Sequence, residues 1–280
     1  MPTLTQTRQV TELAEIARQL RVRIIEMTAA ARSGHPSTSL SSVEICTALH
    51  FSKLRWNPHD PAWPERDRFV LSKGHGVPVL YAVYAQAGAI PEDETQTLRR
   101  IGSRLQGHPD PVRLPFLEAA TGSLGQGLSI ALGMSLGARL DGASWRTYCL
   151  LGDGECEEGQ VWEAAMSAPR FEVGNLCAIV DNNQVQQTGL VTATMDLAPL
   201  ADKFRAFNWH AIEVDGHDHA QVLEALREAQ ATSGKPTAIV SHTIKGKGVS
   251  FMELNPDWHG KAPNAEQAEK AIAEILGRKP

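Results

Sequence analysis

The sequence predicts an α/β protein with a doubly wound, mostly parallel sheet and helices on both faces. Strand-like and helix-like segments alternate through residues 147–242, and the strands at 147–151, 176–181 and 237–242 are almost continuously apolar. Such strands, alternating with helices, are typical of a parallel sheet that is covered on both sides. No repeat, low-complexity tract or linker interrupts residues 1–280, so we expect a single domain.

The first third of the chain is expected to be largely helical. Apolar positions at helical spacing predict a long helix over residues 4–32. The segment SGHPSTSLSS (33–42) predicts a loop, and Ser42 is expected to cap a second helix that runs through Phe51. Three prolines make the segment 57–67 irregular.

The middle of the chain introduces the first strand. The segment RFVLSKGHG (68–76) predicts a short strand that leads into a helix around 79–87. Glycine, proline and polar residues predict a loop-rich stretch over 102–123, and small residues predict a helix that begins near Gly122 and ends near 140.

The remaining elements follow the alternating pattern. Asp218 followed by Gln221 predicts a capping box at the start of one of these helices. The further expected elements are a strand at 210–214, helices near 158–169, 199–207 and 219–230, and an amphipathic helix over 264–280.

Composition excludes several classes of function. The net charge is −5 and no cluster of lysine or arginine exists, so a role in binding nucleic acid or a membrane surface has no electrostatic basis. No apolar run approaches a membrane span, and the start of the chain lacks the apolar core of a signal peptide. The four cysteines occur in no metal-binding or redox spacing, so we expect reduced core residues in a cytoplasmic protein.

Oxygen-bearing side chains follow two neighbouring strands. Asp153 lies in the turn GDG after the strand 147–151, and Asn183 follows the strand 176–181. Ligands of such sheets bind beyond the carboxyl ends of the strands, where both turns are expected to lie. A carboxylate and an amide oxygen suit Mg²⁺ shared with a phosphate, and the acidic residues just after Gly154 favour a metal-bridged diphosphate over a bare one.

Histidines beside glycine form a second group of candidates. They are His35, His75, His108 and His259. Glycine permits a backbone to crowd a ligand, and imidazoles can donate to phosphate or sugar hydroxyls and carry protons near neutral pH. Four other histidines are expected to be solvated, namely His50, His59, His210 and His242. A capped helix start explains His217 and His219.

These segments together resemble the N-terminal half of a transketolase. The spacing of 27 residues between GDG and the pair Asn182-Asn183 is similar to the GDG…NN signature of thiamin diphosphate enzymes. The segments RDRFVLSKGHG, TGSLGQG, GDGECEEGQVWEAAMSA and SHTIKGKGVSFME carry the more specific likeness. The likeness implies the thiamin-diphosphate-binding fold, in its diphosphate-binding domain, and the N-terminal subunit of a split transketolase.

The resemblance assigns cofactor and metal roles to individual positions. Asp153, Asn183 and the backbone carbonyl of Val185 are expected to bind Mg²⁺, with Ca²⁺ or Mn²⁺ as alternatives. The expected contacts to the cofactor are made by His75, Gly154, Asn183 and His259 at the diphosphate, and by Gly122 and Leu124 at the aminopyrimidine.

The resemblance also implies catalytic roles and a partner. His35, His108 and His259 are expected to face the ketose donor, and Glu158 is expected to lie at the subunit interface, facing the partner's catalytic glutamate. In the family, that glutamate belongs to a pyrimidine-binding domain, which we expect to lie on another chain. We therefore expect a separate C-terminal subunit, in an α2β2 assembly that acts on sugar phosphates. Gln187 departs from the aliphatic residue usual near the thiazolium ring.

Two alternatives stay open on the sequence. One is the α subunit of a thiamin enzyme that decarboxylates 2-oxo acids, which the histidine loops disfavour because a keto acid offers no string of hydroxyls. The other is a non-catalytic module that stabilises a partner, which the intact Asp153 and Asn183 disfavour. The sequence does not name the sugar.

Overall fold

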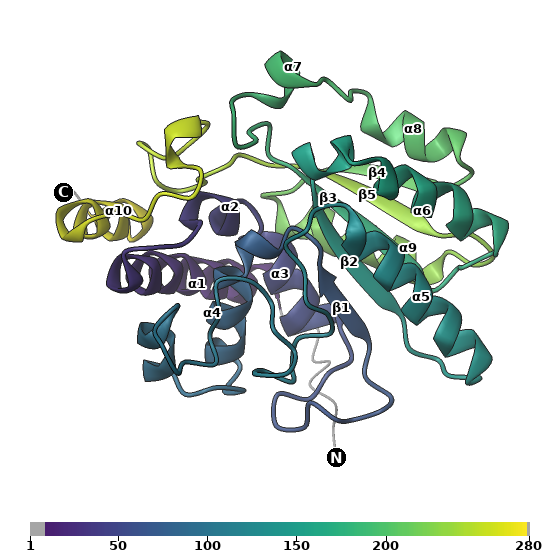
Figure 1. Ribbon diagram of the computed structural model, residues 1–280, viewed down its shortest axis with the longest axis horizontal. Helices are drawn as coiled ribbons and strands as arrows, with labels where there is room; N and C mark the ends of the chain where they lie inside the picture. The colour runs from purple at the N-terminus through teal and green to yellow at the C-terminus, as the bar shows by residue number, and fades with distance from the viewer. Residues whose placement is uncertain (1–8, 279–280) are drawn as a thin grey trace.

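The fold is a parallel sheet with helices packed on both faces (Figure 1). The computed structural model describes residues 9–278. The five strands pair in the order β1-β2-β3-β5-β4, and every pairing is parallel. Their bounds are β1 Arg68–Leu71, β2 Thr147–Gly152, β3 Leu176–Asn182, β4 His210–Asp215 and β5 Thr237–His242. The predicted fold class is confirmed.

The α-helices account for most of the remaining regular structure. They are α1 Val10–Ala31, α2 Pro36–Ser41, α3 Val43–Ala48, α4 Pro78–Gln86, α5 Gln126–Leu140, α6 Gly159–Arg170, α7 Val191–Thr194, α8 Leu200–Ala206, α9 His219–Ala231 and α10 Ala265–Ile275. A π-helical turn, Leu49–Lys53, extends α3, and short 3₁₀ turns occupy Gly74–Gly76, Asp93–Thr97, Gly154–Glu157 and Pro256–Trp258.

Two hydrophobic layers enclose the sheet. One contains α1, α3, α4 and α9 and includes the buried Leu20, Ile24, Leu49 and Leu226. The other contains α5, α6 and α8 and includes Leu128 and Phe204 among its buried side chains. Figure 1 shows α5 and α6 together over the sheet, with α10 beside α1 at the far end of the molecule. The central strands β2 and β3 are buried on both faces, as their apolar runs predicted.

The serine-rich segment before Ser42 differs from the prediction. Residues expected to form a loop form α2, and all six of its side chains are buried. Pro36 occupies the start of the helix, where its missing N–H costs nothing. The hydroxyls of Ser39 and Ser41 donate to the carbonyls of His35 and Thr38, so burial leaves these two hydroxyls paired.

Helix ends show three smaller differences. Ser42 does not cap α3 through its side chain; its hydroxyl donates to the Thr38 carbonyl instead. Asp218 caps α9 by accepting from the N–H groups of Ala220 and Gln221, but Gln221 accepts from the Asp215 N–H, so the reciprocal box does not form. α1 begins at Val10, and residues 4–8 of the expected helix lie outside the described residues.

The prediction that His50 is solvated is wrong. Its side chain is buried, and Nδ1 contacts the Cys46 carbonyl at 3.0 Å. The ring lies edge-on to the aromatic rings of Trp56, Phe69 and Tyr84. All four cysteines are free and buried, as expected. Among residues 9–278, no helix is both long and apolar enough to cross a membrane.

Candidate functional site

The parallel register brings the two oxygen-rich turns together. Gly152 pairs with Asp181 across β2 and β3, and Asp181 pairs with Ser241 across β3 and β5. The next residues of each strand therefore leave the sheet at the same edge. Asp153 and Asn183 are both buried there and line one cavity of about 500 Å³.

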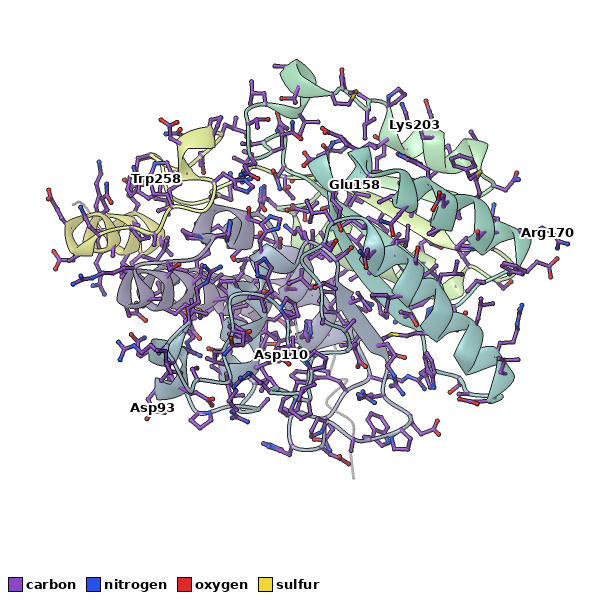
Figure 2. The ribbon with its side chains drawn as sticks, viewed as in Figure 1. Asp93, Asp110, Glu158, Arg170, Lys203 and Trp258 are labelled. Carbon is purple, nitrogen blue, oxygen red and sulfur yellow. The ribbon has the colours of Figure 1, made fainter. Side chains whose placement is uncertain are left out.

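Every candidate residue from the sequence lines this cavity. They are His35, His75, His108, Gly122, Leu124, Asp153, Gly154, Glu158, Asn183, Val185 and His259. Gln187 lines it too, with an exposed side chain. Glu158 lies at the start of α6, on the rim of the cavity (Figure 2). Residues from widely separated parts of the chain are thus gathered at one edge of the sheet.

The oxygen donors of Asp153 are held by backbone groups. Oδ1 accepts from the Gly154 N–H at 2.8 Å, and Oδ2 accepts from the Gln184 N–H at 2.5 Å. Burial, and then the neighbouring Asp181 charge, raises the pKa of Asp153 to about 6. A buried carboxylate with a raised pKa is stabilised by a cation, because the cation restores favourable electrostatics to the charged form.

Asn183 is oriented by its neighbours. Nδ2 donates to Asp181 at 3.0 Å, while Oδ1 accepts from the Val185 N–H at 3.2 Å. The Val185 carbonyl accepts from Lys245 Nζ at 2.8 Å. A carboxylate, an amide oxygen and a carbonyl form a hard donor set that fits Mg²⁺, which commonly completes its coordination with water and phosphate. No cluster of three or more His, Cys, Asp or Glu suited to a metal occurs in residues 9–278.

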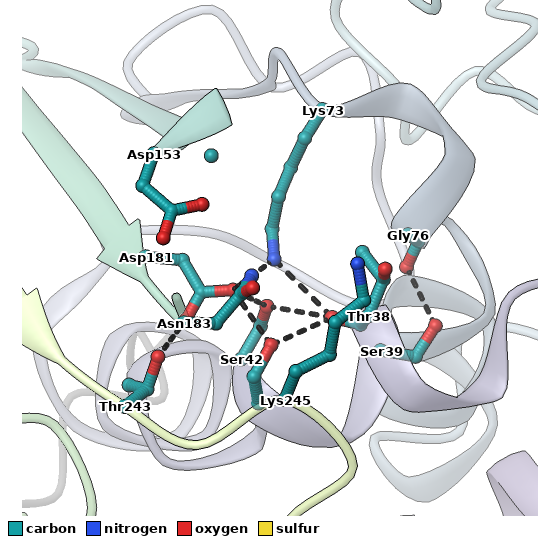
Figure 3. A network of polar contacts seen from close by, with 12 residues as sticks. Thr38, Ser39, Ser42, Lys73, Gly76, Asp153, Asp181, Asn183, Thr243 and Lys245 are labelled. Carbon is teal, nitrogen blue, oxygen red and sulfur yellow. Dashed lines mark hydrogen bonds and ion pairs between the residues drawn. The ribbon is translucent and has the colours of Figure 1, made fainter. Parts of the chain in front are cut away.

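A buried ion pair lies beneath these donors (Figure 3). Lys73, which follows β1, contacts Asp181 on β3, and both side chains are almost completely buried. Asp181 also accepts from the hydroxyls of Ser41 and Thr243. Burial alone raises the pKa of Asp181, but the Lys73 charge and these hydrogen bonds outweigh it and lower the pKa. Asp181 therefore remains charged and fixes the Asn183 amide.

Three of the imidazoles that line the cavity lie close to one another. The ring centres of His35, His75 and His259 lie 5.1 to 5.5 Å apart. Burial lowers the pKa of His35 to about 4 and of His259 to about 3, and it lowers the pKa of His75 well below its usual value. Neutral rings can both donate and accept hydrogen bonds, which suits recognition of hydroxyls. The buried Nδ1 of His35 has no partner within the described residues.

His108 packs against the glycine at the mouth of the cavity. A Cβ added to Gly122, whose φ is +134°, would lie 2.6 Å from His108 Cδ2. Only glycine permits this approach and this backbone conformation together. Burial, and then Arg99, lowers the pKa of His108.

Glu155, the first acidic residue after Gly154, uses its carboxylate in hydrogen bonds within the protein. Glu155 is buried, and its carboxylate accepts from the N–H groups of Gly125 and Gly152 and from the Ser72 hydroxyl. Its burial raises its pKa. The carboxylate is therefore occupied in joining the end of β2 to the start of α5, which reduces the repulsion that the sequence suggested for a bound anion.

Two buried lysines were missed by the sequence reasoning. Besides Lys73, Lys245 reaches the cavity with its Nζ 2.7 Å from His259 Nδ1. Burial, and then the Lys73 charge, lowers the pKa of Lys245 to about 7. The segment TIKGKG after β5 places lysine between turn residues at the carboxyl edge, and this is the pattern that could have revealed it. Because Asp181 neutralises Lys73, Lys245 is the lysine that can add positive charge to the cavity in its protonated form.

Comparison with known proteins shows the family to which the chain belongs. The family model described as transketolase, thiamine diphosphate binding domain, matches residues 12–280. The transketolase of Homo sapiens is 45% identical over 267 residues, which are 95% of this chain and 42% of the human protein. The chain thus spans well under half the length of this relative.

Two relatives of similar length are named as subunits of transketolases. One, from Phocaeicola vulgatus, is named for apulose 4-phosphate and is 40% identical, with 96% of each chain covered. The other, from Clostridium sp., is named for 6-deoxy-6-sulfo-D-fructose and is 42% identical, with 95% of this chain and 97% of that protein covered. Among solved structures, transketolase from Campylobacter jejuni superposes with a TM-score of 0.90 at 31% identity, over 98% of this chain and 44% of that one.

Proposed function

The chain belongs to the transketolase family through its thiamine diphosphate-binding domain, and we propose that it is the N-terminal subunit of a two-subunit transketolase. In this proposal residues 1–280 act as one diphosphate-binding domain. The observation that carries it is the single cavity at the carboxyl edge of the sheet, where Asp153, Asn183, Lys245 and the histidines meet. The two subunit relatives of matching length support a separate partner.

The proposed binding of the cofactor follows from the donors at this edge. Asp153, Asn183 and the Val185 carbonyl would hold Mg²⁺, while His75, Gly154, Asn183 and His259 would contact the diphosphate. Lys245 would add a positive charge beside them. A bound anion would favour the charged form of Lys245, whose pKa burial lowers to about 7.

The rest of the cavity is proposed to receive the ring end of the cofactor and the sugar. Gly122 and Leu124 would lie against the aminopyrimidine. When bound, thiamin diphosphate supplies the carbanion chemistry that cleaves and forms the carbon–carbon bond of a ketose. His35, His108 and His259 would orient the hydroxyls of the donor and move protons at those oxygens, since their rings are neutral near pH 7.

The partner is proposed to complete the site. It would supply the pyrimidine-binding domain with its glutamate, and Glu158 on the rim would face that glutamate across the interface. An α2β2 assembly in the cytoplasm, with Mg²⁺ as the metal and a sugar phosphate as substrate, completes the proposal. The two subunit relatives are named for different sugars, so the particular ketose stays open.

Reconstitution tests the proposal. The purified chain should show little ketol transfer from xylulose 5-phosphate to an aldose, and addition of the C-terminal subunit should restore it. Full activity of the chain alone would contradict the two-subunit proposal. Turnover of pyruvate in place of the ketose would favour a decarboxylating enzyme. Unchanged partner-supported activity in Asp153→Ala would favour a non-catalytic module.

A further inference from the structure

A histidine outside the cavity holds the loop that carries Lys245. His217 lies in the turn between β4 and α9, and its Nε2 accepts a hydrogen bond of 2.8 Å from the backbone N–H of Ile244. Ile244 directly precedes Lys245 in the chain. His217 does not line the cavity, and its contact with the backbone next to Lys245 connects it to the site.

Both ring nitrogens of His217 have a partner. A backbone N–H can only donate, so Nε2 is the unprotonated nitrogen and Nδ1 carries the hydrogen. Nδ1 donates to the buried carboxylate of Glu44 at 3.1 Å. Glu44 is held in turn by Arg21, whose guanidinium lies 2.6 Å from the other carboxylate oxygen. The orientation and the tautomer of the ring are therefore both fixed.

The same cluster grips the loop on the far side of Lys245. Arg21 Nε donates to the carbonyl of Lys247 at 3.2 Å. His217 thus binds the backbone one residue before Lys245, and Arg21 binds it two residues after. Glu44 contacts both side chains. The side chains come from α1, α3 and the β4–α9 turn, so three separate elements act on one short loop.

Gly216 allows the turn to approach the loop. A Cβ at this position would lie 2.2 Å from Ser241 Oγ and 2.4 Å from Thr243 Cγ2, distances that no side chain can adopt. The Gly216 N–H also donates to the His242 carbonyl at 2.8 Å. The sequence Gly216-His217 therefore places the imidazole against the end of β5, where the Lys245 loop begins.

We propose that His217, together with Glu44 and Arg21, positions the Lys245 ammonium in the cavity and so sets the affinity of the site for a diphosphate group. The inference rests on the proposed function for the identity of the ligand, but the loop contacts themselves do not. The loop has further anchors, including the hydrogen bond from the Gly246 N–H to the Ser37 carbonyl. Loss of His217 should therefore loosen the loop without unfolding it.

Two substitutions separate the two bonds of the ring. In His217→Gln, the side-chain oxygen reaches the position of Nε2 and can still accept from Ile244, although the bond to Glu44 is lost. In His217→Asn, the amide reaches the position of Nδ1 and can still donate to Glu44, although the bond to Ile244 is lost. The proposal predicts that the asparagine variant loses order in the Lys245 loop and affinity for the cofactor. The glutamine variant should largely keep both.

Hydrogen exchange on the purified chain tests the positioning role without any cofactor. In His217→Asn, the amides of residues 244–247 should exchange faster, while those of α9 and β5 keep the wild-type rates. In His217→Gln, residues 244–247 should stay close to wild type. Equal acceleration throughout α9 and β5, or no change at 244–247 in the asparagine variant, would overturn the proposal.

Cofactor titration of the reconstituted enzyme tests the consequence. With Mg²⁺ present, His217→Asn should raise the Kd for thiamin diphosphate by about 2- to 10-fold, the range expected for one lost hydrogen bond. The same substitution should have little effect in a Lys245→Met background, because the lysine that it positions is absent. An equal effect in both backgrounds would contradict a role through Lys245.

A matched control removes a similar contact elsewhere. His210 contacts Glu228 at 2.6 Å at the opposite end of β4, so His210→Asn should leave both the exchange at 244–247 and the Kd unchanged. Absence of thiamin diphosphate binding to the wild-type enzyme would refute the proposed function. The exchange data would still decide whether His217 positions the loop.

Discussion

Buried histidines make the stability of the chain depend on pH. His50 illustrates this outside the cavity, because burial lowers its pKa to about 4 and its hydrogen bond to the Cys46 carbonyl only partly opposes the shift. The unfolded chain binds a proton at this side chain below about pH 6.5, whereas the folded chain does not until about pH 4. Folding stability therefore falls as the pH drops through this window.

Substitution of His50 by phenylalanine should remove this part of the pH dependence. The aromatic ring keeps the contacts to Trp56, Phe69 and Tyr84 but cannot titrate. Between pH 7 and pH 4, His50→Phe should lose about 2 to 3 kcal/mol less stability than wild type. Urea denaturation at several pH values measures the difference, and parallel curves for the two proteins would contradict the assignment.

Sequence reasoning found the cavity residues but not the buried charges that support them. Asp153 and Asn183 stand out because each directly follows an apolar strand at a recognisable spacing. Lys73 and Lys245 do not, since their burial depends on Asp181 and on the loop after β5, which only the folded chain brings near. In the sequence a capped helix start explains His217, and its contacts to Ile244 and Glu44 cannot be read there because both residues are remote along the chain.

At the scale of single elements, Gly127 allows α5 to pack closely against Ser72, directly after β1. A Cβ at Gly127 would lie 2.3 Å from Ser72 Oγ and 2.8 Å from the Ser72 backbone, so this turn of the helix rests directly on the end of β1. Gly133, two turns later, is exposed and meets nothing within 4 Å. Close packing thus requires glycine at position 127, whereas no contact within this chain requires glycine at position 133.

Alanine at these two positions should have opposite effects. Gly127→Ala should destabilise the purified chain by about 1 to 3 kcal/mol, because the methyl group has no room. Gly133→Ala should stabilise it by up to about 1 kcal/mol through helix propensity. Thermal and chemical denaturation report both values. A stable Gly127→Ala protein would mean that α5 can shift away from β1 at little cost.

The helix α2, which was expected to be a loop, shows what local sequence cannot reveal. α2 lacks an apolar period and is rich in serine and threonine, which locally favours a loop. It becomes a helix because the surrounding core buries it and the carbonyls of His35 and Thr38 accept from Ser39 and Ser41. The strands of the sheet were predicted almost to the residue, since their apolar runs need no tertiary partner to be recognised.

At the scale of the whole molecule, the Lys73–Asp181 ion pair connects two strands of the sheet with helix α2. Lys73 follows β1, Asp181 lies on β3, and the Lys73 ammonium also donates to the Thr38 carbonyl of α2 at 3.2 Å. The pair therefore joins the sheet to the helical segment that carries His35. A charge left alone at this depth is costly, whereas a partner of opposite charge offsets much of that cost.

Removal of one partner should cost more than removal of both charges. Lys73→Met should destabilise the chain by about 3 to 5 kcal/mol, since it leaves Asp181 buried and uncompensated. Addition of Asp181→Asn should recover part of the loss, because the amide is neutral and its oxygen can keep one of the two hydrogen bonds that Ser41 and Thr243 donate to separate carboxylate oxygens. Chemical denaturation of the single and double variants tests this. A double variant less stable than Lys73→Met would contradict the buried-charge explanation.

The proposed function depends on a divalent cation that Asp153 and Asn183 would hold beside the diphosphate of the cofactor. Calorimetric titration of thiamin diphosphate into the reconstituted enzyme, with and without Mg²⁺, measures this most directly. Mg²⁺ should increase the affinity markedly in wild type and in the exposed control Asp141→Ala, and the increase should vanish in Asp153→Ala. Equal affinity with and without Mg²⁺ in wild type, or an undiminished increase in Asp153→Ala, would contradict the account.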